Sequence, residues 1–235
     1  MTYDQAKRDF VKLLDKASLH KRSDEVFLDF LKVVSISFQN ATETRPSVIA
    51  EREEEYLAIC NRYDREVFEL FPEMMALISL ALEDKFGDFL GEVYMASQMG
   101  NNKVGQFFTP YSVSSASARL LFNRGEVDKA IDEQGYIRFN EPASGSGGMI
   151  IAYIEAMREA GYNPQTRLYV DAQDIDQRCA LMCYVALCIL HIPARVYIGD
   201  TLMQEYHEVL ETPSLCCQWL RFRNAGSIVK IKNKM

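Results

Sequence analysis

The chain has 235 residues, of which 48% are hydrophobic, and a formal net charge of -7. This length and composition can bury a sizeable core, whereas the acidic charge excludes a protein that coats nucleic acid by bulk electrostatics alone. No apolar run reaches the roughly 18 to 20 residues that span a bilayer, and the start, MTYDQAKRDF, lacks the apolar core of a secretory signal. We therefore expect a soluble, cytoplasmic protein with no membrane partner.

The first hundred residues show the spacing of amphipathic helices. Phe27, Phe30, Leu31 and Val34 recur at helical intervals. The charged stretch EREEE is most simply the solvated face of a helix. We predict a helical N-terminal region at residues 1–100, with a boundary where MGNNKVGQFFTPYS introduces turn-forming residues.

The remainder, residues 101–235, alternates strand and helix patterns. After a helix that starts at Ser112 come the strand YIRFNE, the helix MIIAYIEAMREA closed by Gly161, the strand RLYVDAQD, the helix QRCALMCYVALCIL and the strand ARVYIGD. This order is the first half of a doubly wound parallel sheet. The predicted fold class is therefore α/β, a helical region followed by a partial Rossmann-like parallel sheet.

The stretch FNEPASGSGG lies between the first strand and its helix. Gly145, Gly147 and Gly148 allow the backbone to approach a ligand, and the helix N-terminus offers free N–H groups. A tight strand-to-helix turn also needs glycine when nothing binds, so a purely structural loop is the alternative interpretation.

Acidic residues follow the other two strands. Asp174 and Asp176 come after the second strand, where a carboxylate can accept ribose hydroxyls, and Asp200 ends the third. Glu141, just before the loop, would repel a pyrophosphate and favours an amine or a sulfonium. The pattern indicates S-adenosylmethionine as the cofactor, and no metal site is predicted.

The order GQFFTPYSVSSASARLL, NEPASGSGGM, DAQDID and GDTL resembles the N6-adenine DNA methyltransferases, especially the methylation subunits of type I restriction-modification systems. The resemblance covers roughly residues 100–202. It implies an S-adenosylmethionine-dependent, adenine-specific DNA methyltransferase fold, preceded by a helical region. It also implies DNA as a partner.

The resemblance assigns cofactor-binding roles by matching position. A wall over the methionine end of the cofactor would consist of Gln106, Phe107, Phe108, Thr109, Pro110 and Tyr111. The amino acid moiety would be bracketed by Glu141, Ala143, Ser144, Gly145, Ser146 and Gly147. Asp174 would accept hydrogen bonds from the ribose hydroxyls, and Asp200 would face the amino group of the cofactor's adenine. For Phe107 and Phe108, plain core packing is the alternative.

One motif of the family is missing. Methylation of adenine requires acceptors for the hydrogens of its poorly nucleophilic amine and an aromatic platform for the flipped base, which the family supplies as Asn or Asp, Pro-Pro and an aromatic residue. This chain has no such tetrapeptide, and its only proline after Asp200 is Pro213. The 35 residues after Asp200 are also fewer than the second half of the sheet needs, so we predict a truncated sheet and leave the catalytic residues unassigned.

Two functions remain open at this stage. The chain is a methyltransferase whose amine-binding residues are unusual or come from a partner subunit or a second copy, or it is a catalytically inactive relative that acts as a cofactor- or DNA-binding regulatory module. The segment WLRFRNAGSIVKIKNKM, residues 219–235, carries five Lys or Arg residues and no acidic one. It is either a solvated tail or an arm that contacts DNA phosphates.

Overall fold

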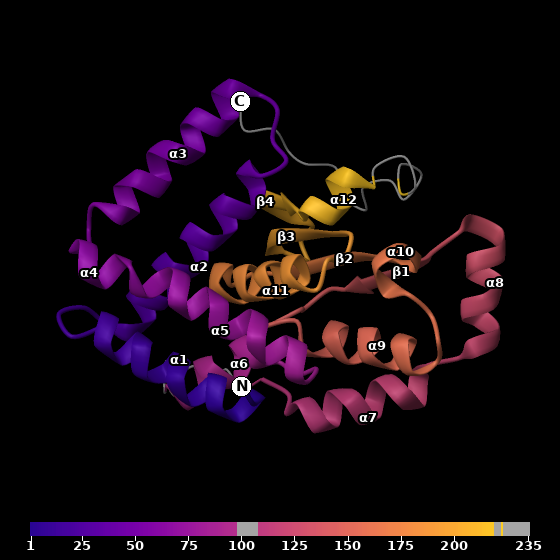
Figure 1. The fold of residues 1–235 in the computed structure, drawn as a ribbon. Coiled ribbons are helices and arrows are strands. Elements are labelled where there is room, and N and C mark those ends of the chain that lie inside the picture. Colours follow the sequence, from indigo (N-terminus) through magenta and orange to yellow (C-terminus); the bar gives the residue numbers. More distant parts are fainter. Residues whose placement is uncertain (98–107, 219–221, 223–235) are drawn as a thin grey trace. The chain divides into compact units, whose positions relative to one another are not determined.

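The computed structural model describes residues 1–97, 108–218 and 222 (Figure 1). The chain divides into two compact units, Met1–Phe108 and Thr109–Met235. The boundary predicted at residue 100 lies outside the described residues. Within these residues, no helix has both the length and the apolar character needed to cross a membrane.

The described residues of the first unit form helices, as the apolar spacing predicts. They are α1 (Tyr3–Ala17), α2 (Ser23–Asn40), α3 (Pro46–Cys60), α4 (Arg65–Phe68), α5 (Leu70–Asp84) and α6 (Phe89–Ala96). Aromatic rings fill the core between them, and the rings of Phe10 and Phe30 meet edge to face with centroids 5.6 Å apart. Burying these rings is the main stabilising contribution.

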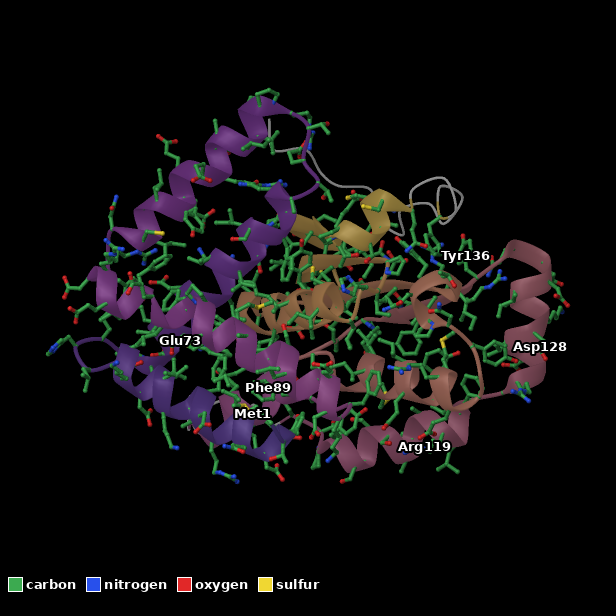
Figure 2. The ribbon with its side chains drawn as sticks, in the orientation of Figure 1. Met1, Glu73, Phe89, Arg119, Asp128 and Tyr136 are labelled. Atoms are coloured by element: carbon green, nitrogen blue, oxygen red, sulfur yellow. The ribbon has the colours of Figure 1, made fainter. Side chains whose placement is uncertain are left out.

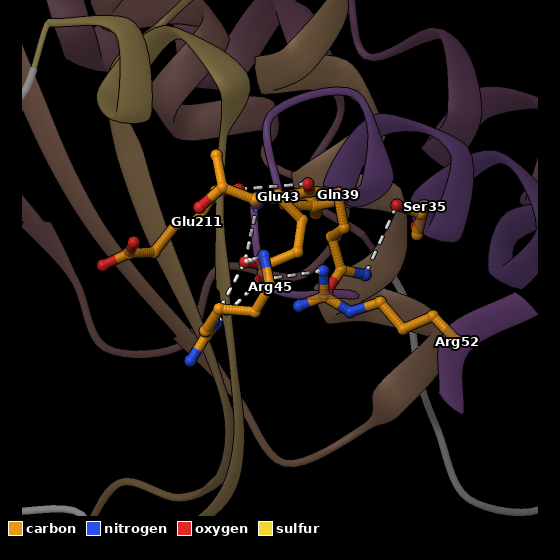
Figure 3. A network of polar contacts seen from close by, with 8 residues as sticks. Ser35, Gln39, Glu43, Arg45, Arg52 and Glu211 are labelled. Carbon is orange, nitrogen blue, oxygen red and sulfur yellow. Dashed lines mark hydrogen bonds and ion pairs between the residues drawn. The ribbon is translucent and has the colours of Figure 1, made fainter. Parts of the chain in front are cut away.

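A polar network closes the turn between α2 and α3 (Figure 3). The carboxylate of Glu43 accepts hydrogen bonds of 2.9 and 2.7 Å from the Arg45 guanidinium and lies 3.6 Å from that of Arg52. The hydrogen bonds from Arg45 lower the pKa of Glu43 to about 2. The glutamates of the EREEE stretch on α3 are exposed, as expected for a solvated face.

The second unit contains the sheet. Its elements are α7 (Tyr111–Leu121), α8 (Arg124–Gln134), β1 (Ile137–Glu141), α9 (Gly148–Glu159), α10 (Pro164–Arg167), β2 (Leu168–Asp174), α11 (Gln177–Ile189), β3 (Ala194–Asp200), β4 (Glu205–Glu211) and α12 (Pro213–Cys217). The three strands predicted from the sequence correspond to β1, β2 and β3. The α/β fold class is confirmed.

The strands lie in the order β1-β2-β3-β4. The first three are parallel, with Phe139 opposite Val170 and Ala172 opposite Val196, whereas β4 runs antiparallel to β3. The sequence analysis did not anticipate β4, and the sheet is therefore mostly rather than entirely parallel. The turn of residues 201–204 is too short for a crossover, so the chain can only return as a hairpin.

Helices cover the two faces of this sheet unequally. Phe139 of β1 stacks on Tyr153 of α9, with ring centroids 4.7 Å apart. On the opposite face, Tyr169 of β2 packs in a cluster with Leu215 of α12 and Phe222. Figure 1 accordingly shows α9 and α11 on one side of the sheet and α12 on the other. Helix α11 is buried over most of its length. This agrees with its sequence, which is apolar on nearly every side.

Side-chain hydrogen bonds to two glutamates of α9 hold helix α7 against it. Arg119, labelled in Figure 2, makes hydrogen bonds of 2.9 and 2.6 Å to the carboxylate of Glu159. One turn earlier on α9, Glu155 accepts hydrogen bonds from Tyr111 (3.1 Å) and Ser115 (3.2 Å). These bonds fix the start of α7 against the helix that follows the glycine loop.

A buried carboxylate occupies the middle of the sheet, on the face toward α12. The Asp171 side chain has no exposed surface and lies 2.9 Å from the guanidinium of Arg138. It also accepts hydrogen bonds from the hydroxyls of Tyr169 (2.9 Å) and Tyr197 (3.1 Å). Burial raises the pKa of Asp171, and these partners offset that effect.

Candidate functional site

The glycine loop connects β1 to α9 in a tight turn. Gly145 and Gly147 have φ angles of 54° and 97°, in the left-handed region that favours glycine. The Ser144 N–H donates to the Gln173 carbonyl (2.8 Å), and the Gly147 N–H donates to the Ser144 carbonyl (2.9 Å). A Cβ at Gly147 would also lie 3.3 Å from Cys183 Sγ on α11. Close packing on α11 therefore accounts for Gly147 without a ligand.

Asp174, at the end of β2, holds this loop in place. Its Oδ2 accepts the Gly145 N–H (2.8 Å), and its Oδ1 accepts the Asp176 N–H (2.9 Å). The side chain is half-buried, and this burial raises its pKa. Each carboxylate oxygen can accept more than one hydrogen bond, so Asp174 can bind the loop and a ligand together.

Asp176 bonds to the start of helix α11 rather than to the glycine loop. Its Oδ1 accepts the Arg178 N–H (2.8 Å) at the start of α11, and its carboxylate lies 3.0 Å from the Arg178 guanidinium. This is a helix N-cap with an added ion pair. Of the two acidic residues after β2, Asp176 caps the helix and Asp174 faces the loop.

Glu141 adds a second carboxylate beside the loop. It is half-buried and accepts the Ala143 N–H at 3.3 Å. Burial, and secondarily the negative charge of Asp174, raise its pKa. Two nearby carboxylates that are both costly to ionise favour a cationic ligand group between or beside them.

The end of β3 reaches the same loop. Asp200 Oδ1 accepts the N–H groups of Leu202 (2.9 Å) and Met203 (3.0 Å), which shapes the turn into β4. The hydroxyl of Thr201 donates to the carbonyl of Pro142 (2.8 Å). The structure thus brings the ends of all three parallel strands together at one edge of the sheet, as the sequence predicts. Thr201 was missed, although its place in GDTL was a signal.

Buried hydroxyl groups of the loop add to this edge. Ser144 and Ser146 are buried, and Ser144 Oγ makes no hydrogen bond to any described residue. A buried hydroxyl without a partner is costly. Helix α9 also begins without a side-chain cap, so its first N–H groups face the loop. The edge therefore offers donors and carboxylate acceptors within one short loop, which fits a ligand with an amino acid group and a ribose.

The other predicted site residues, 106–111, immediately precede α7 in the sequence or begin it. Gln106 and Phe107 are outside the described residues. Phe108 belongs to the first unit, with its ring 5.7 Å from that of Tyr94. Thr109 and Pro110 are exposed, and the Tyr111 hydroxyl is bound to Glu155 of α9. A wall over the cofactor, made by these residues, stays a prediction. The basic segment of residues 219–235 also lies outside the described part, apart from Phe222.

Pro213, the proline after Asp200, lies far from the glycine loop. Because β4 is antiparallel, Glu211 pairs with Arg195 at the beginning of β3, and the Thr212 N–H donates to the Ala194 carbonyl (3.0 Å). Pro213 therefore lies at the opposite edge of the sheet. Tyr206 is buried, with its ring 5.4 Å from that of Tyr197, so it presents no open aromatic face. Neither residue replaces the missing amine-binding motif.

This chain is similar to one family of known proteins and, more weakly, to solved structures. A family model described as N-6 DNA Methylase matches residues 83–218. Among solved structures, a class I S-adenosylmethionine-dependent methyltransferase from Listeria monocytogenes is 15% identical, with a TM-score of 0.47, over 85% of this chain and 55% of that one.

The methyltransferase subunit of a type I restriction-modification system from Streptococcus thermophilus is 17% identical, with a TM-score of 0.41, over 85% of this chain and 58% of that one. This chain thus spans a little over half the length of either structure. None of the curated proteins matches it significantly.

Within the described residues, no three His, Cys, Asp or Glu side chains are placed to hold a metal ion.

Proposed function

The chain belongs to the N-6 DNA methylase family, and we propose that it forms the S-adenosylmethionine-binding part of an adenine-N6 DNA methyltransferase of the restriction-modification type. The observation that carries this proposal is the Gly145–Asp174 hydrogen bond (2.8 Å). It sets a left-handed glycine and a half-buried carboxylate next to each other, beside the unpartnered hydroxyl of Ser144. Because each carboxylate oxygen accepts more than one hydrogen bond, Asp174 can hold the loop and still accept from a ligand.

Each group of the edge has a task in this proposal. Asp174 accepts the ribose hydroxyls, while Glu141 and the Ser144 hydroxyl hold the ammonium and carboxylate of the amino acid moiety. Asp200 uses Oδ1 to shape its own turn, and its Oδ2 accepts a hydrogen bond from the amino group of the cofactor's adenine. When bound, S-adenosylmethionine supplies a methyl group on a positively charged sulfur, which nearby carboxylates favour electrostatically.

Calorimetric titration of the full chain with S-adenosylmethionine tests this proposal. We expect one site with an affinity between about 1 μM and 1 mM, which corresponds to roughly 4 to 8 kcal/mol. Titration with S-adenosylhomocysteine, which lacks the methyl group and the sulfonium charge, should give binding at the same site. Absence of heat with both ligands would favour a glycine loop that is purely structural.

Methyl transfer is a separate question, because the chain lacks the tetrapeptide of Asn or Asp, Pro-Pro and an aromatic residue that would bind the target adenine. We expect the purified chain alone to methylate adenine-containing duplex DNA at or near background while it binds the cofactor. Radiolabelled methyl transfer to adenine N6 is the measurement. Robust turnover by the isolated chain would show that it contains a base-binding group that the described residues do not reveal.

The same observation favours a second candidate function. A chain that binds the cofactor and never transfers the methyl group, whatever partner is added, is a cofactor- or DNA-binding regulatory module. The basic residues from Arg221 to Lys234 would then give weak, salt-sensitive DNA binding without base selection. The test is to measure binding to duplex DNA across a range of salt concentrations, with and without S-adenosylmethionine. It distinguishes this module from an enzyme that requires a partner for methyl transfer.

A further inference from the structure

The corner between α7 and α8 presents apolar side chains to solvent. Leu120 and Leu121, at the end of α7, are 86% and 77% exposed. The side chain of Asn123 caps the start of α8, so the two leucines lie next to the first turn of that helix. Single exposed apolar residues are normal on a protein surface, whereas two neighbouring, almost fully exposed leucines gain from burial by a further segment.

Helix α8 carries an excess of negative charge. Its cations are Arg124 and Lys129, and its acidic residues are Glu126, Asp128, Asp132 and Glu133. The last turn has no basic residue, although the negative end of the helix dipole favours cations there. Asp132 forms no ion pair with a described residue, and Glu133 has Lys129 at 3.9 Å. A cationic partner would therefore be stabilised on this helix.

The position of Phe222 fixes where the following segment begins. Its ring centroid lies 5.1 Å from that of Tyr136, and Tyr136 directly follows Gly135, the C-cap of α8. Residues 223–235 therefore start beside the last turn of α8. At roughly 3.3 Å per residue they can extend over about 40 Å, whereas the 11 residues of α8 span about 16 Å. The segment is long enough to follow α8 back to Leu120 and Leu121.

The composition of this segment complements the surface. Residues 223–235, RNAGSIVKIKNKM, contain four Lys or Arg residues and no acidic one, with Ile228, Val229 and Ile231 among the lysines. The same stretch thus offers apolar side chains to the leucines and cations to the carboxylates. A single exposed ion pair contributes little. A tethered segment, however, has an effective concentration on the order of millimolar, so several weak contacts are enough to hold it.

We propose that residues 223–235 dock on the α8 surface, which consists of Leu120, Leu121 and the acidic residues of α8, and that duplex DNA displaces them. In the docked state the lysines of the segment face carboxylates of α8. DNA phosphates require the same cations, so the two contacts exclude each other. Helix α8 then competes with DNA for the basic segment. The inference goes beyond the proposed function, because it requires neither S-adenosylmethionine nor methyl transfer.

Zero-length cross-linking of the full chain with a water-soluble carbodiimide tests the docking, because this reagent joins lysine amines to carboxylates that touch them. The expected products join Lys230, Lys232 or Lys234 to carboxylates of α8. Raising the salt to about 0.5 M should reduce their yield about fivefold or more, since exposed charges are then screened. The variant Leu120→Ser/Leu121→Ser, which keeps every carboxylate, should also give fewer of these products.

Two results of the cross-linking would overturn the docking. One is that these lysines join no carboxylate, or only carboxylates outside α8, such as those of the EREEE stretch on α3. The other appears in an equal mixture of ordinary and isotope-labelled chain. Cross-links within one isotope support docking of the chain's own segment, whereas cross-links between the two isotopes assign the surface to the segment of a second copy.

Neutralising α8 tests the competition with DNA. The variant Glu126→Gln/Asp132→Asn/Glu133→Gln should bind a short DNA duplex about five- to tenfold more tightly than wild type at about 50 mM salt, because the basic segment is released. Unchanged affinity, or no DNA binding by this variant, would overturn the competition.

A matched control removes the same number of charges from an exposed stretch of α3. The variant Glu51→Gln/Glu53→Gln/Glu54→Gln should change DNA affinity less than about twofold. An equal gain in both variants would mean that net charge alone controls DNA binding, which contradicts the inference. Calorimetry with S-adenosylmethionine is independent of these measurements, so absent cross-links leave the proposed function intact and absent cofactor binding leaves the docking intact.

Discussion

The sheet holds a buried carboxylate in its middle and two half-buried carboxylates at its edge, and these differ in the partners that the chain gives them. Asp171, in the middle of the sheet, is surrounded by an arginine and two tyrosines of the chain itself. At the strand ends, Glu141 and Asp174 accept backbone N–H groups and form no ion pair with a described residue, and the Ser144 hydroxyl beside them makes no hydrogen bond to a described residue.

We interpret this difference as one between a structural site and a candidate binding site. A buried charge that its own chain neutralises contributes to a unique fold and has no need of a ligand. Half-buried carboxylates that accept backbone N–H groups, beside a hydroxyl that has no partner among the described residues, gain from a ligand that brings positive charge and hydrogen bonds. We therefore expect substitutions in the first group to change stability and substitutions in the second to change binding.

The largest expected effect is on the Asp171 group. Asp171→Ala leaves Arg138 and two tyrosine hydroxyls without their acceptor, which should lower the free energy of unfolding by about 3 to 5 kcal/mol. Asp132→Ala, at an exposed position on α8, is the matched control and should change it by less than about 0.5 kcal/mol. Urea unfolding measures both variants. A stable Asp171→Ala chain would mean that the network carries little of the fold's stability.

The next effect is on the loop itself. Gly145→Val should weaken S-adenosylmethionine binding by at least about 100-fold, or roughly 2.7 kcal/mol, because a branched side chain is strained at this φ and lies where the ligand must pass. Gly161→Val places the same side chain in a left-handed position with open space, at the far end of α9. That control should lose stability but keep its affinity. Undiminished binding by Gly145→Val would move the site elsewhere.

The two aspartates after β2 should separate binding from capping. Asp174→Ala should cost about 1.5 to 3 kcal/mol of cofactor affinity, because it removes a charged acceptor. Asp176→Ala removes a helix cap and should instead cost about 0.5 to 2 kcal/mol of stability. Calorimetry and urea unfolding of both variants measure the two effects. A neutral Asp174→Ala together with a damaging Asp176→Ala would show that the wrong carboxylate has been assigned to the ligand.

The smallest effect concerns pH. The pKa of Glu141 is raised in the folded chain, chiefly by burial, so its contribution to stability is present below the unfolded pKa and is lost as pH rises through the folded pKa. Wild type should therefore lose stability relative to Glu141→Gln as pH rises above the ordinary pKa of a glutamate. Urea unfolding at several pH values measures this difference. Parallel curves of unfolding free energy against pH for the two chains would show that Glu141 is more solvated than its burial indicates.

Much of the site was predictable because its residues act through local rules. Gly145 lies in a strand-to-helix turn, and Asp174 lies at a strand end; both positions follow from periodicity and from the chemistry of the turn. Tyr206 was harder to place, because burial does not alternate regularly along β4. Thr201 lies in the turn before this strand, where no periodicity identifies it. The role of Asp176 as a cap became clear only from its bond to the Arg178 N–H.

The sequence by itself determined the helical first region, the three parallel strands and the glycine loop with acidic strand ends, since each depends on side-chain period and turn chemistry within a few residues. Tertiary structure alone decided which carboxylate is neutralised and which is not, because Arg138 meets Asp171 across 33 residues of chain. It also decided that Pro213 lies at the edge of the sheet opposite the glycine loop and that β1 is the outer one of the described parallel strands. Strand order and direction depend on long-range pairing, which no local pattern encodes.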